Sequence, residues 1–225
     1  MIVAVVPMKP LALAKRRLSA ALPEGQRRAL VRAMLCDVLS ALSGCAQVGR
    51  TFVVTADPEV IELAARHKAG HIPEVVPAGL NKAVATAAGY LEDIGAGAML
   101  VVPGDVPLVT RAEIGELASL LRPRGMAIVP AHDRNGTNAL LLSPPAVLAP
   151  SFGPGSFKRH FETGSKAGLA PAVCPLEGLG RDIDEAADLD ILMRVKESSL
   201  EYGFLRQAAG RDFSGMRQTM ERERA

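Results

Sequence analysis

Short β-branched segments alternate with longer helical patterns along the chain as far as Val129, and this rhythm constrains the fold more than any other feature. The predicted strands are Ile2–Val6, Thr51–Thr55, Glu74–Val76, Met99–Val102 and Met126–Val129. Strands separated by helices pair in parallel, because each helix returns the chain to the same end of the sheet. The sequence therefore predicts an α/β fold with a mostly parallel central sheet flanked by helices.

Helical patterns occupy the intervals between these strands. The first interval carries an apolar residue at every fourth position, namely Leu30, Met34, Val38 and Leu42. This spacing forms one apolar stripe on a helix, and Pro23 suits the first turn of that helix. Later intervals predict helices over Pro58–Lys68, Gly79–Leu91 and Thr110–Leu121.

The length and the apolar content of the chain favour one compact core. With 225 residues and 48% hydrophobic side chains, the expected organisation is a single domain with a short appended tail. The rhythm breaks after Val129 in a stretch rich in Pro, Gly and Asn, so we expect a substrate-side insertion over about 130–165. We predict a main domain over 1–197 and, over 198–225, a peripheral helix followed by a flexible C-terminal tail.

Charge and cysteine usage narrow the classes of partner. The 26 basic and 24 acidic residues are well mixed, so neither a nucleic-acid groove nor an anionic membrane surface is expected. Cys36, Cys45 and Cys174 lack a CxxC spacing and indicate buried, reduced thiols rather than disulfides or a zinc site. The apolar start Ile2–Val6 is too short for a signal peptide or a membrane span. We therefore predict a cytoplasmic protein that binds small molecules.

The loop after the first predicted strand is basic. In doubly wound sheets, ligands collect beyond the carboxyl ends of the strands, and here that position is followed by Lys9, Lys15, Arg16 and Arg17. Cations at this place would neutralise a triphosphate during transfer. Arg16 and Arg17 fit a solvated loop equally well, whereas Lys9 and Lys15 lie closer to the strand and are the stronger candidates.

Acidic residues follow two other extended segments. Asp105 comes after a hydrophobic strand, where it could bind Mg²⁺, since this ion takes one or two carboxylates together with water and phosphate oxygens. Asp182 and Asp184 lie two residues apart, so an extended backbone projects both from one face while Ile183 turns toward the core. Like charges this close favour a cation between them. Simpler roles stay open, since Asp105 could form an Asx turn or cap a helix, and Asp184 could cap the helix Glu185–Val195.

A glycine-rich stretch in the second half of the chain suits an anion. Gly153 and Gly155 allow a close approach of the backbone to a ligand, and Ser156 opens a helix whose first N–H groups face outward. Thr137 and Asn138 could add a hydroxyl and an amide to this pocket, although turn chemistry accounts for each of them as well.

Five segments, taken in order, resemble the guanylyltransferases of coenzyme F420 biosynthesis. They are VPMKPLALAKRRL, PGDVPLV, DRNGTNALLL, FGPGSFKRH and DIDEAADL, and the resemblance covers roughly residues 1–195. It implies a single-domain GT-A-like fold of the nucleotide-diphospho-sugar transferase type. It also implies an enzyme that joins GTP to 2-phospholactate, phosphoenolpyruvate or 3-phosphoglycerate and releases pyrophosphate.

The resemblance also implies roles for individual residues, with Mg²⁺ as the cofactor. The implied metal ligands are Asp105, Asp182 and Asp184, and the implied catalytic residues are Lys9, Lys15 and Asp105. Nucleotide binding is assigned to Pro7, Lys9, Lys15, Asn81 and Gly104, although Asn81 could equally cap the next helix. Substrate binding is assigned to Thr137, Asn138, Gly153 and Ser156. The family's GTT pattern reads Gly136-Thr137-Asn138 here, which leaves the identity of the acid open.

Other functions stay compatible with these residues. A cytidylyl- or molybdopterin-type nucleotidyltransferase would keep the fold and change the substrates, and a non-catalytic sensor would bind GTP and a phospho-acid without joining them. Three acidic positions argue against simple triphosphate binding. Because transfer to an ionised phosphate requires no proton removal, His160 is expected to have a positioning role at most. Small α/β enzymes of this kind are often homodimers, which leaves a homodimer as an expected assembly.

Overall fold

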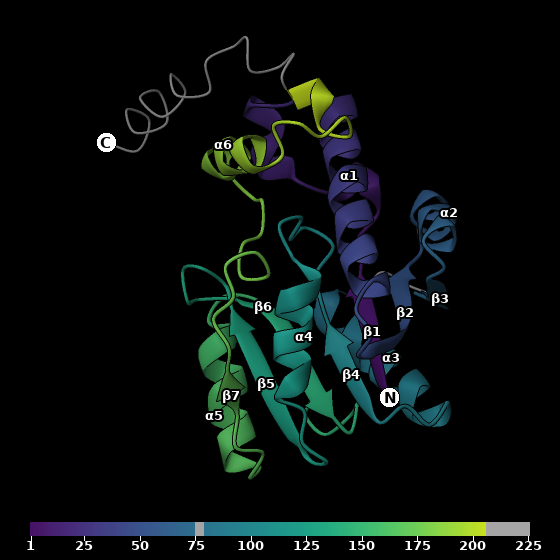
Figure 1. Cartoon of the computed structure of the whole chain (residues 1–225), viewed down its shortest axis with the longest axis vertical. Helices are drawn as coiled ribbons and strands as arrows, with labels where there is room; N and C mark the ends of the chain where they lie inside the picture. Colours follow the sequence, from purple (N-terminus) through teal and green to yellow (C-terminus); the bar gives the residue numbers. More distant parts are fainter. Residues whose placement is uncertain (75–78, 206–225) are drawn as a thin grey trace.

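The strands form one twisted sheet with helices on both faces (Figure 1). The computed structural model describes residues 1–74 and 79–205, and within them the sheet has seven strands in the order β3-β2-β1-β4-β6-β5-β7. The strands are β1 Ile2–Pro7, β2 Val48–Thr55, β3 Gly70–Pro73, β4 Ala98–Val101, β5 Gly125–Pro130, β6 Thr137–Ser143 and β7 Ala172–Val173. The helices are α1 Glu24–Ser43, α2 Pro58–Arg66, α3 Leu80–Asp93, α4 Arg111–Ser119, α5 Ser156–Lys166 and α6 Ala186–Val195, with short 3-10 turns at Leu11–Leu13 and Arg16–Ala20.

Alternating side chains of the sheet build two apolar layers. In β1, Ala4 and Val6 pack into a layer covered by α1, α2, α4 and α6, whereas Val3 and Val5 pack into a layer beneath α3 and α5. Because both faces are covered, β1 and β4 are apolar throughout, as expected for parallel strands in the middle of a doubly covered sheet. The α/β class and the mostly parallel sheet are confirmed.

One strand of the described sheet runs against the others, and it determines the geometry of the functional rim. β6 lies between β4 and β5 and is antiparallel to both, while the pairs β1–β2, β1–β4, β2–β3 and β5–β7 are parallel. The apolar run Ala139–Leu142, which the sequence placed in an insertion, is therefore part of the central sheet. As an antiparallel strand, β6 begins at the edge where β4 and β5 end.

The third strand lies earlier in the chain than predicted. The segment expected over Glu74–Val76 is wrong in position, because β3 covers Gly70–Pro73 and Glu74 follows it. Its register pairs Phe52 with Gly70, and a side chain at Gly70 would collide with the Phe52 ring at 2.5 Å. The remaining residues of the predicted segment, 75 and 76, lie outside the described residues.

Helix starts follow side-chain caps that the sequence offers. Asp57 caps α2 through the Glu59 N–H, and Thr110 forms a reciprocal capping box with Glu113 at the start of α4. At α6 the cap is Glu185, paired with Asp188, so the alternative that Asp184 caps this helix is wrong. Asp184 keeps its side chain free for another contact.

The packed body extends beyond residue 197. Tyr202 and Leu205 are buried in the apolar layer beneath α1, and the Tyr202 hydroxyl donates to Asp37 Oδ2 at 2.7 Å. The rest of the predicted tail, residues 206–225, lies outside the described residues. Of the three thiols, Cys45 and Cys174 are buried and Cys36 is half-buried. Among the described helices, none is both long and apolar enough to cross a membrane.

Two glycines provide a matched test of this packing. A methyl group at Gly178 would lie 2.1 Å from the Leu108 carbonyl oxygen, whereas one at the exposed Gly89 of α3 meets nothing within 4 Å. We expect Gly178→Ala to lower the free energy of unfolding by about 2 kcal/mol through overpacking. Gly89→Ala should raise it by up to about 1 kcal/mol through helix propensity. Urea unfolding of both variants checks the prediction, and equal effects would contradict it.

Candidate active site

An ion-paired lysine joins two distant carboxylates at the rim of the sheet. Lys15 Nζ lies 2.6 Å from Asp105 Oδ2 and 2.6 Å from Asp184 Oδ1. The Lys15 side chain is only 6% exposed, but Asp105 and Asp184 are 32% and 41% exposed, so a solute can reach the carboxylates. The loops after β1 and β4 and the segment before α6 therefore meet at this rim, and the Asp105 carboxylate is engaged across the fold.

The backbone around Lys15 is held in place on both sides. Lys15 has a left-handed conformation with φ 52°, which is uncommon for a residue other than glycine. Leu11 before it and Leu18 after it are buried, and the Leu11 N–H donates to Asp57 Oδ2 at 2.8 Å. Asp57 thus caps α2 and fixes the basic loop at once. The contact with Leu11 joins residues far apart along the chain, so no local pattern around Asp57 predicts it.

Backbone contacts bring the acidic segments together. The Asp105 carbonyl oxygen accepts a hydrogen bond from the Ile183 N–H at 3.1 Å, and Ile183 is fully buried between the two acidic residues that flank it. The Met8 side chain packs against Gly104 just before Asp105, where a β-carbon would lie 2.2 Å from the Met8 sulfur. The loops after β1 and β4 and the segment before α6 therefore form one structural unit.

The electrostatics of this cluster favour the charged forms of its ion pair. Burial acts to lower the pKa of Lys15, but Asp105 and Asp184 outweigh burial and raise it above its ordinary value. Burial acts to raise the pKa of Asp184, but Lys15, then Arg17 and Lys9, hold it below its usual value. Lys15 is therefore an ammonium and Asp184 a carboxylate at neutral pH.

Burial and a neighbouring negative charge oppose the charged form of Asp182. Its pKa is raised by burial and by the charge of Asp105, against a hydrogen bond from Asn138 Nδ2 at 3.2 Å that favours the carboxylate. A carboxylate that is partly buried next to another one gains from an added positive charge nearby. A cation bound nearby would therefore favour the charged form of Asp182.

The donor set fits a divalent cation without forming a closed metal site. Within residues 1–74 and 79–205 no group of three or more His, Cys, Asp or Glu side chains is arranged to hold a metal ion. Asp105 and Asp184 nevertheless direct one oxygen each at a common point, where Lys15 now supplies the positive charge. Mg²⁺ needs only one or two carboxylates when phosphate oxygens and water complete its shell. Asp105 and Asp184 therefore offer the two carboxylates that an open, substrate-completed site requires, with the charge of Asp182 nearby.

A β-bulge at Asn138 directs two neighbouring polar side chains to different partners. Val129 pairs with Ala139 but Pro130 pairs with Thr137, so Asn138 is an extra residue in β6. A regular strand would put Thr137 on the same face as Ala139. With the bulge, Thr137 contacts His160 of α5 on the opposite face, and Asn138 contacts Asp182. Bulges often re-aim side chains next to active sites in this way.

The glycine-rich stretch forms the start of α5 beside this bulge. Gly153 and Gly155 have φ angles of 116° and 71°, which a residue with a side chain rarely adopts. Asn135 holds the turn, because its Oδ1 accepts from the Gly155 N–H at 2.9 Å. Ser156 is 1% exposed, and its Oγ has no hydrogen-bond partner in the described part of the chain. A buried hydroxyl without a partner is costly unless a ligand completes it.

Asn81 contacts this substrate-side loop in the present structure. Asn81 Oδ1 accepts from the Phe152 N–H at 2.6 Å, and its Nδ2 donates to the Phe152 carbonyl oxygen at 3.2 Å. The cap of α3 is Gly79, so Asn81 does not cap its own helix. Its assignment to the nucleotide stays a prediction, and the contact shows that Asn81 ties the start of α3 to the loop before α5.

The remaining predicted residues lie in or next to the loops after β1 and β4. Pro7 and Gly104 lie at the ends of the segments that carry Lys9 and Asp105. Lys9 is exposed and acts on Asp184 only through its charge. Arg17, which the sequence left open, lies 3.6 Å from Asp184 Oδ2 and joins the cationic side of the rim.

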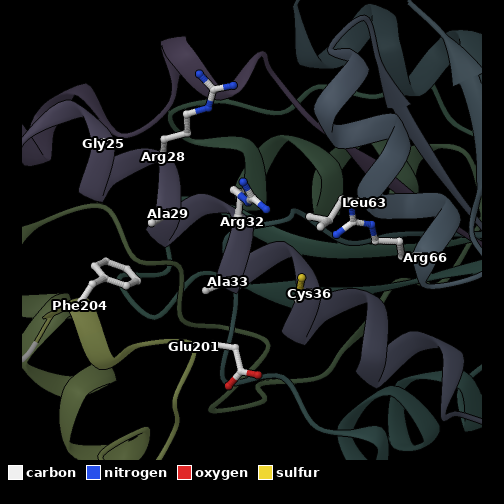
Figure 2. A pocket seen from close by; sticks show the side chains of 10 residues that line it. All are labelled: Gly25, Arg28, Ala29, Arg32, Ala33, Cys36, Leu63, Arg66, Glu201 and Phe204. Carbon is white, nitrogen blue, oxygen red and sulfur yellow. The ribbon is translucent and has the colours of Figure 1, made fainter.

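A separate cavity lies away from these residues. It has a volume of about 450 Å³ and is lined from α1 and α2 by Arg32, Cys36 and Arg66, with Phe204 facing them (Figure 2). None of the predicted site residues lines it. Arg32 also binds Glu59 at 2.7 Å, so part of the positive charge at this cavity is already paired.

Comparison with known proteins decides the family. The family model described as "Guanylyl transferase CofC like" matches residues 2–219. This chain belongs to that family. Its membership, together with the ion-paired rim, makes the protein a nucleotidyltransferase and confirms the resemblance drawn from the five segments.

Relatives and solved structures agree with this CofC-like assignment. The phosphoenolpyruvate guanylyltransferase of Sphaerobacter thermophilus is 41% identical over 84% of this chain and 91% of its own, and that of Conexibacter woesei is 38% identical over 85% and 87%. A protein from Desulfovibrio desulfuricans G20 that carries the name nucleotide-diphospho-sugar transferase aligns with a TM-score of 0.76 at 18% identity, over 93% of this chain and 95% of that one. A nucleotidyl transferase from Methanothermobacter aligns with a TM-score of 0.62 at 18% identity, over 87% and 99%. These structures confirm the expected nucleotide-diphospho-sugar transferase fold.

His160 makes the stability of this CofC-like protein depend on pH. Burial and the charge of Arg159 lower the pKa of His160 to about 4. The unfolded chain, whose histidine has a pKa near ~6.5, takes up a proton first as the pH falls. His160 thus has no effect on stability above pH ~6.5 and costs roughly 3 kcal/mol as the pH falls toward ~4. Urea unfolding of the wild type and of His160→Gln across this range measures the difference, and parallel curves would refute it.

Proposed function

We propose that this protein transfers a guanylyl group from GTP to phosphoenolpyruvate. A phosphate oxygen of the acid attacks the α-phosphorus of GTP, the bond between that phosphorus and the bridging oxygen breaks, and pyrophosphate leaves with the electron pair. The product carries a guanosine diphosphate linkage and serves coenzyme F420 biosynthesis. The observation that carries this proposal is the cluster of Lys15, Asp105 and Asp184 at the strand ends. The family and the names of the relatives support guanylyl transfer and make phosphoenolpyruvate the first acid to test.

Two polyanions must meet for this reaction, so charge neutralisation is the main task of the site. Lys9 and Lys15, with Arg17 beside them, supply positive charge for the leaving pyrophosphate. Gly104 leaves room for the Met8 side chain, which brings the loop after β4 close to the loop after β1, and Pro7 ends β1 at the same nucleotide-binding rim. Asp105, Asp182 and Asp184 would hold Mg²⁺, which when bound lowers the cost of charge at the α-phosphate. In the absence of ligand, Lys15 balances the charge of Asp105 and Asp184.

The acceptor acid is assigned to the other side of the cluster. Thr137 and Asn138 lie at the bulge, and Ser156 opens α5 beside the two glycine turns. The buried Ser156 hydroxyl, which has no hydrogen-bond partner among the described residues, is suited to a phosphate or carboxylate. Asn138 contacts Asp182, so the acceptor side and the acidic cluster adjoin each other.

A substrate screen separates the proposal from its alternatives. Purified protein is incubated with Mg²⁺, GTP or CTP, and each of phosphoenolpyruvate, 2-phospholactate and 3-phosphoglycerate, and released pyrophosphate is measured. We expect release with GTP and phosphoenolpyruvate. Release with CTP instead would indicate a cytidylyltransferase. Binding of GTP and acid with no pyrophosphate in any mixture would indicate a sensor and would overturn the proposal.

Removal of one carboxylate should stop turnover while the fold persists. We expect Asp105→Asn to lower kcat roughly 100-fold, because it removes charge from the point where Lys15 and the proposed Mg²⁺ bind. Asp93→Asn, at the exposed end of α3, is the matched control and should keep wild-type turnover. Chelation of divalent ions should abolish the wild-type activity, and added Mg²⁺ should restore it. Wild-type turnover of Asp105→Asn at saturating Mg²⁺ would exclude the assigned role.

A further inference from the structure

His160 has both ring nitrogens engaged inside the protein, which defines where its proton lies. The ring is fully buried, and Nε2 lies 3.0 Å from the Ser151 backbone nitrogen. A backbone N–H can only donate, so Nε2 accepts and carries no proton. A neutral imidazole then has its proton on Nδ1. An imidazolium would direct one N–H against another at Ser151, so this contact favours the neutral ring.

The same geometry defines the direction of the second hydrogen bond. His160 Nδ1 lies 3.0 Å from Thr137 Oγ1, so the Nδ1–H donates and the hydroxyl oxygen accepts. The hydroxyl proton of Thr137 is then available to another acceptor. Without His160 the Thr137 hydroxyl could rotate and act either as a donor or as an acceptor.

The surroundings indicate the position of that acceptor. Ser156 lies one turn before His160 on the same buried side of α5, and its Oγ has no partner among the described residues. Thr137 is 8% exposed and precedes Asn138, which contacts Asp182. Thr137 and Ser156 thus place two buried hydroxyls beside His160, next to the glycine turns where the acceptor acid is assigned.

We propose that His160 is a positioning residue that makes the Thr137 hydroxyl a hydrogen-bond donor to an anionic oxygen of the acceptor acid. This inference rests on the proposed function, because it requires a phosphate or carboxylate at the start of α5. An oxygen of either group only accepts, so a hydroxyl held as a donor matches it in both cases. His160 itself does not touch the acid and moves no proton in the reaction.

The same histidine also holds the loop that borders the acceptor. Ser151 donates to Nε2, and the Phe152 ring packs edge-on against the imidazole with centroids 5.0 Å apart. Arg159 donates to the Ser151 carbonyl oxygen at 2.8 Å, and Asn81 holds the Phe152 backbone from α3. Arg159 is the charged group that acts on His160, and together with burial it keeps the ring neutral at neutral pH. The loop and the hydroxyl are therefore oriented by one neutral side chain.

The tautomer can be measured without any activity. The chain has four histidines, so ¹⁵N-detected imidazole spectra of the full-length protein are simple, and the His160→Gln spectrum identifies the His160 signals. We expect a protonated Nδ1 and a bare Nε2 that do not change between neutral and mildly acidic pH. A proton on Nε2, or on both nitrogens, would overturn the proposal whatever the enzyme does.

Kinetics test the effect on the acceptor. Thr137→Val removes the hydroxyl, and His160→Gln places its amide at the position of Nε2 and leaves Thr137 without its donor. Each should raise the KM for phosphoenolpyruvate roughly tenfold and leave the KM for GTP unchanged, since one hydrogen bond to a charged oxygen is lost. His160→Asn places an amide N–H near the position of Nδ1 and should recover most of the acceptor affinity.

The double variant distinguishes positioning from general loosening of the fold. His160→Gln in the Thr137→Val background should cause no further rise in the acceptor KM, because its effect passes through the hydroxyl. An unchanged acceptor KM in Thr137→Val, an additive double variant, or a parallel rise in the KM for GTP would each overturn the proposal. If His160→Gln does not fold, Thr137→Val alone and the wild-type spectra still decide it. If the wild type releases no pyrophosphate with any acid, the proposed function fails, and the spectra test the tautomer separately.

Discussion

The functional rim of this protein depends on one ammonium group held between two carboxylates. Lys15 contributes a charge that Asp105 and Asp184 both require, and these three residues come from the loops after β1 and β4 and from the segment before α6. Without that charge, two carboxylates would face each other at a partly buried edge and repel. A left-handed backbone at Lys15 and the contact between Asp57 and Leu11 hold the ammonium in place. The same balance of charge suits the triphosphate and the divalent cation of the proposed reaction.

The antiparallel strand β6 brings Thr137 and Asn138 to this edge. Because β6 runs against β4, its first residues lie where β4 ends, and Asn138 meets Asp182 beside Asp105. The bulge then separates Thr137 from Asn138, so that one contacts α5 and the other contacts the acidic cluster. A parallel strand in the same place would have put these side chains at the opposite end of the sheet. The reversal of one strand therefore places the start of β6 beside the acidic cluster at the ends of the parallel strands.

Much of this arrangement could be predicted from the sequence, because it depends on residues that are close together along the chain. The strands around Val5 and Leu100 are apolar on both faces, and caps such as Thr110 with Glu113 define helix starts within a few residues. Asp105, Lys15 and Asp184 each follow or precede a recognisable element, so their place at the rim follows from the rule for parallel sheets. The third strand was misplaced because its position depends on pairing with Phe52 and on the room that Gly70 leaves for that ring.

The amino-acid sequence by itself determined the α/β class, the family and the residue types that gather at the strand ends. These follow from periodicity, turn residues and short motifs, which involve residues close together along the chain. Only the tertiary structure decided that Lys15 bridges Asp105 and Asp184, that β6 is reversed and bulged, and that His160 accepts from Ser151 and donates to Thr137. Each of these depends on the distance and direction between groups that lie far apart along the chain. Charge pairing and hydrogen-bond polarity act over a few ångströms in space, so their partners are defined when the chain has packed.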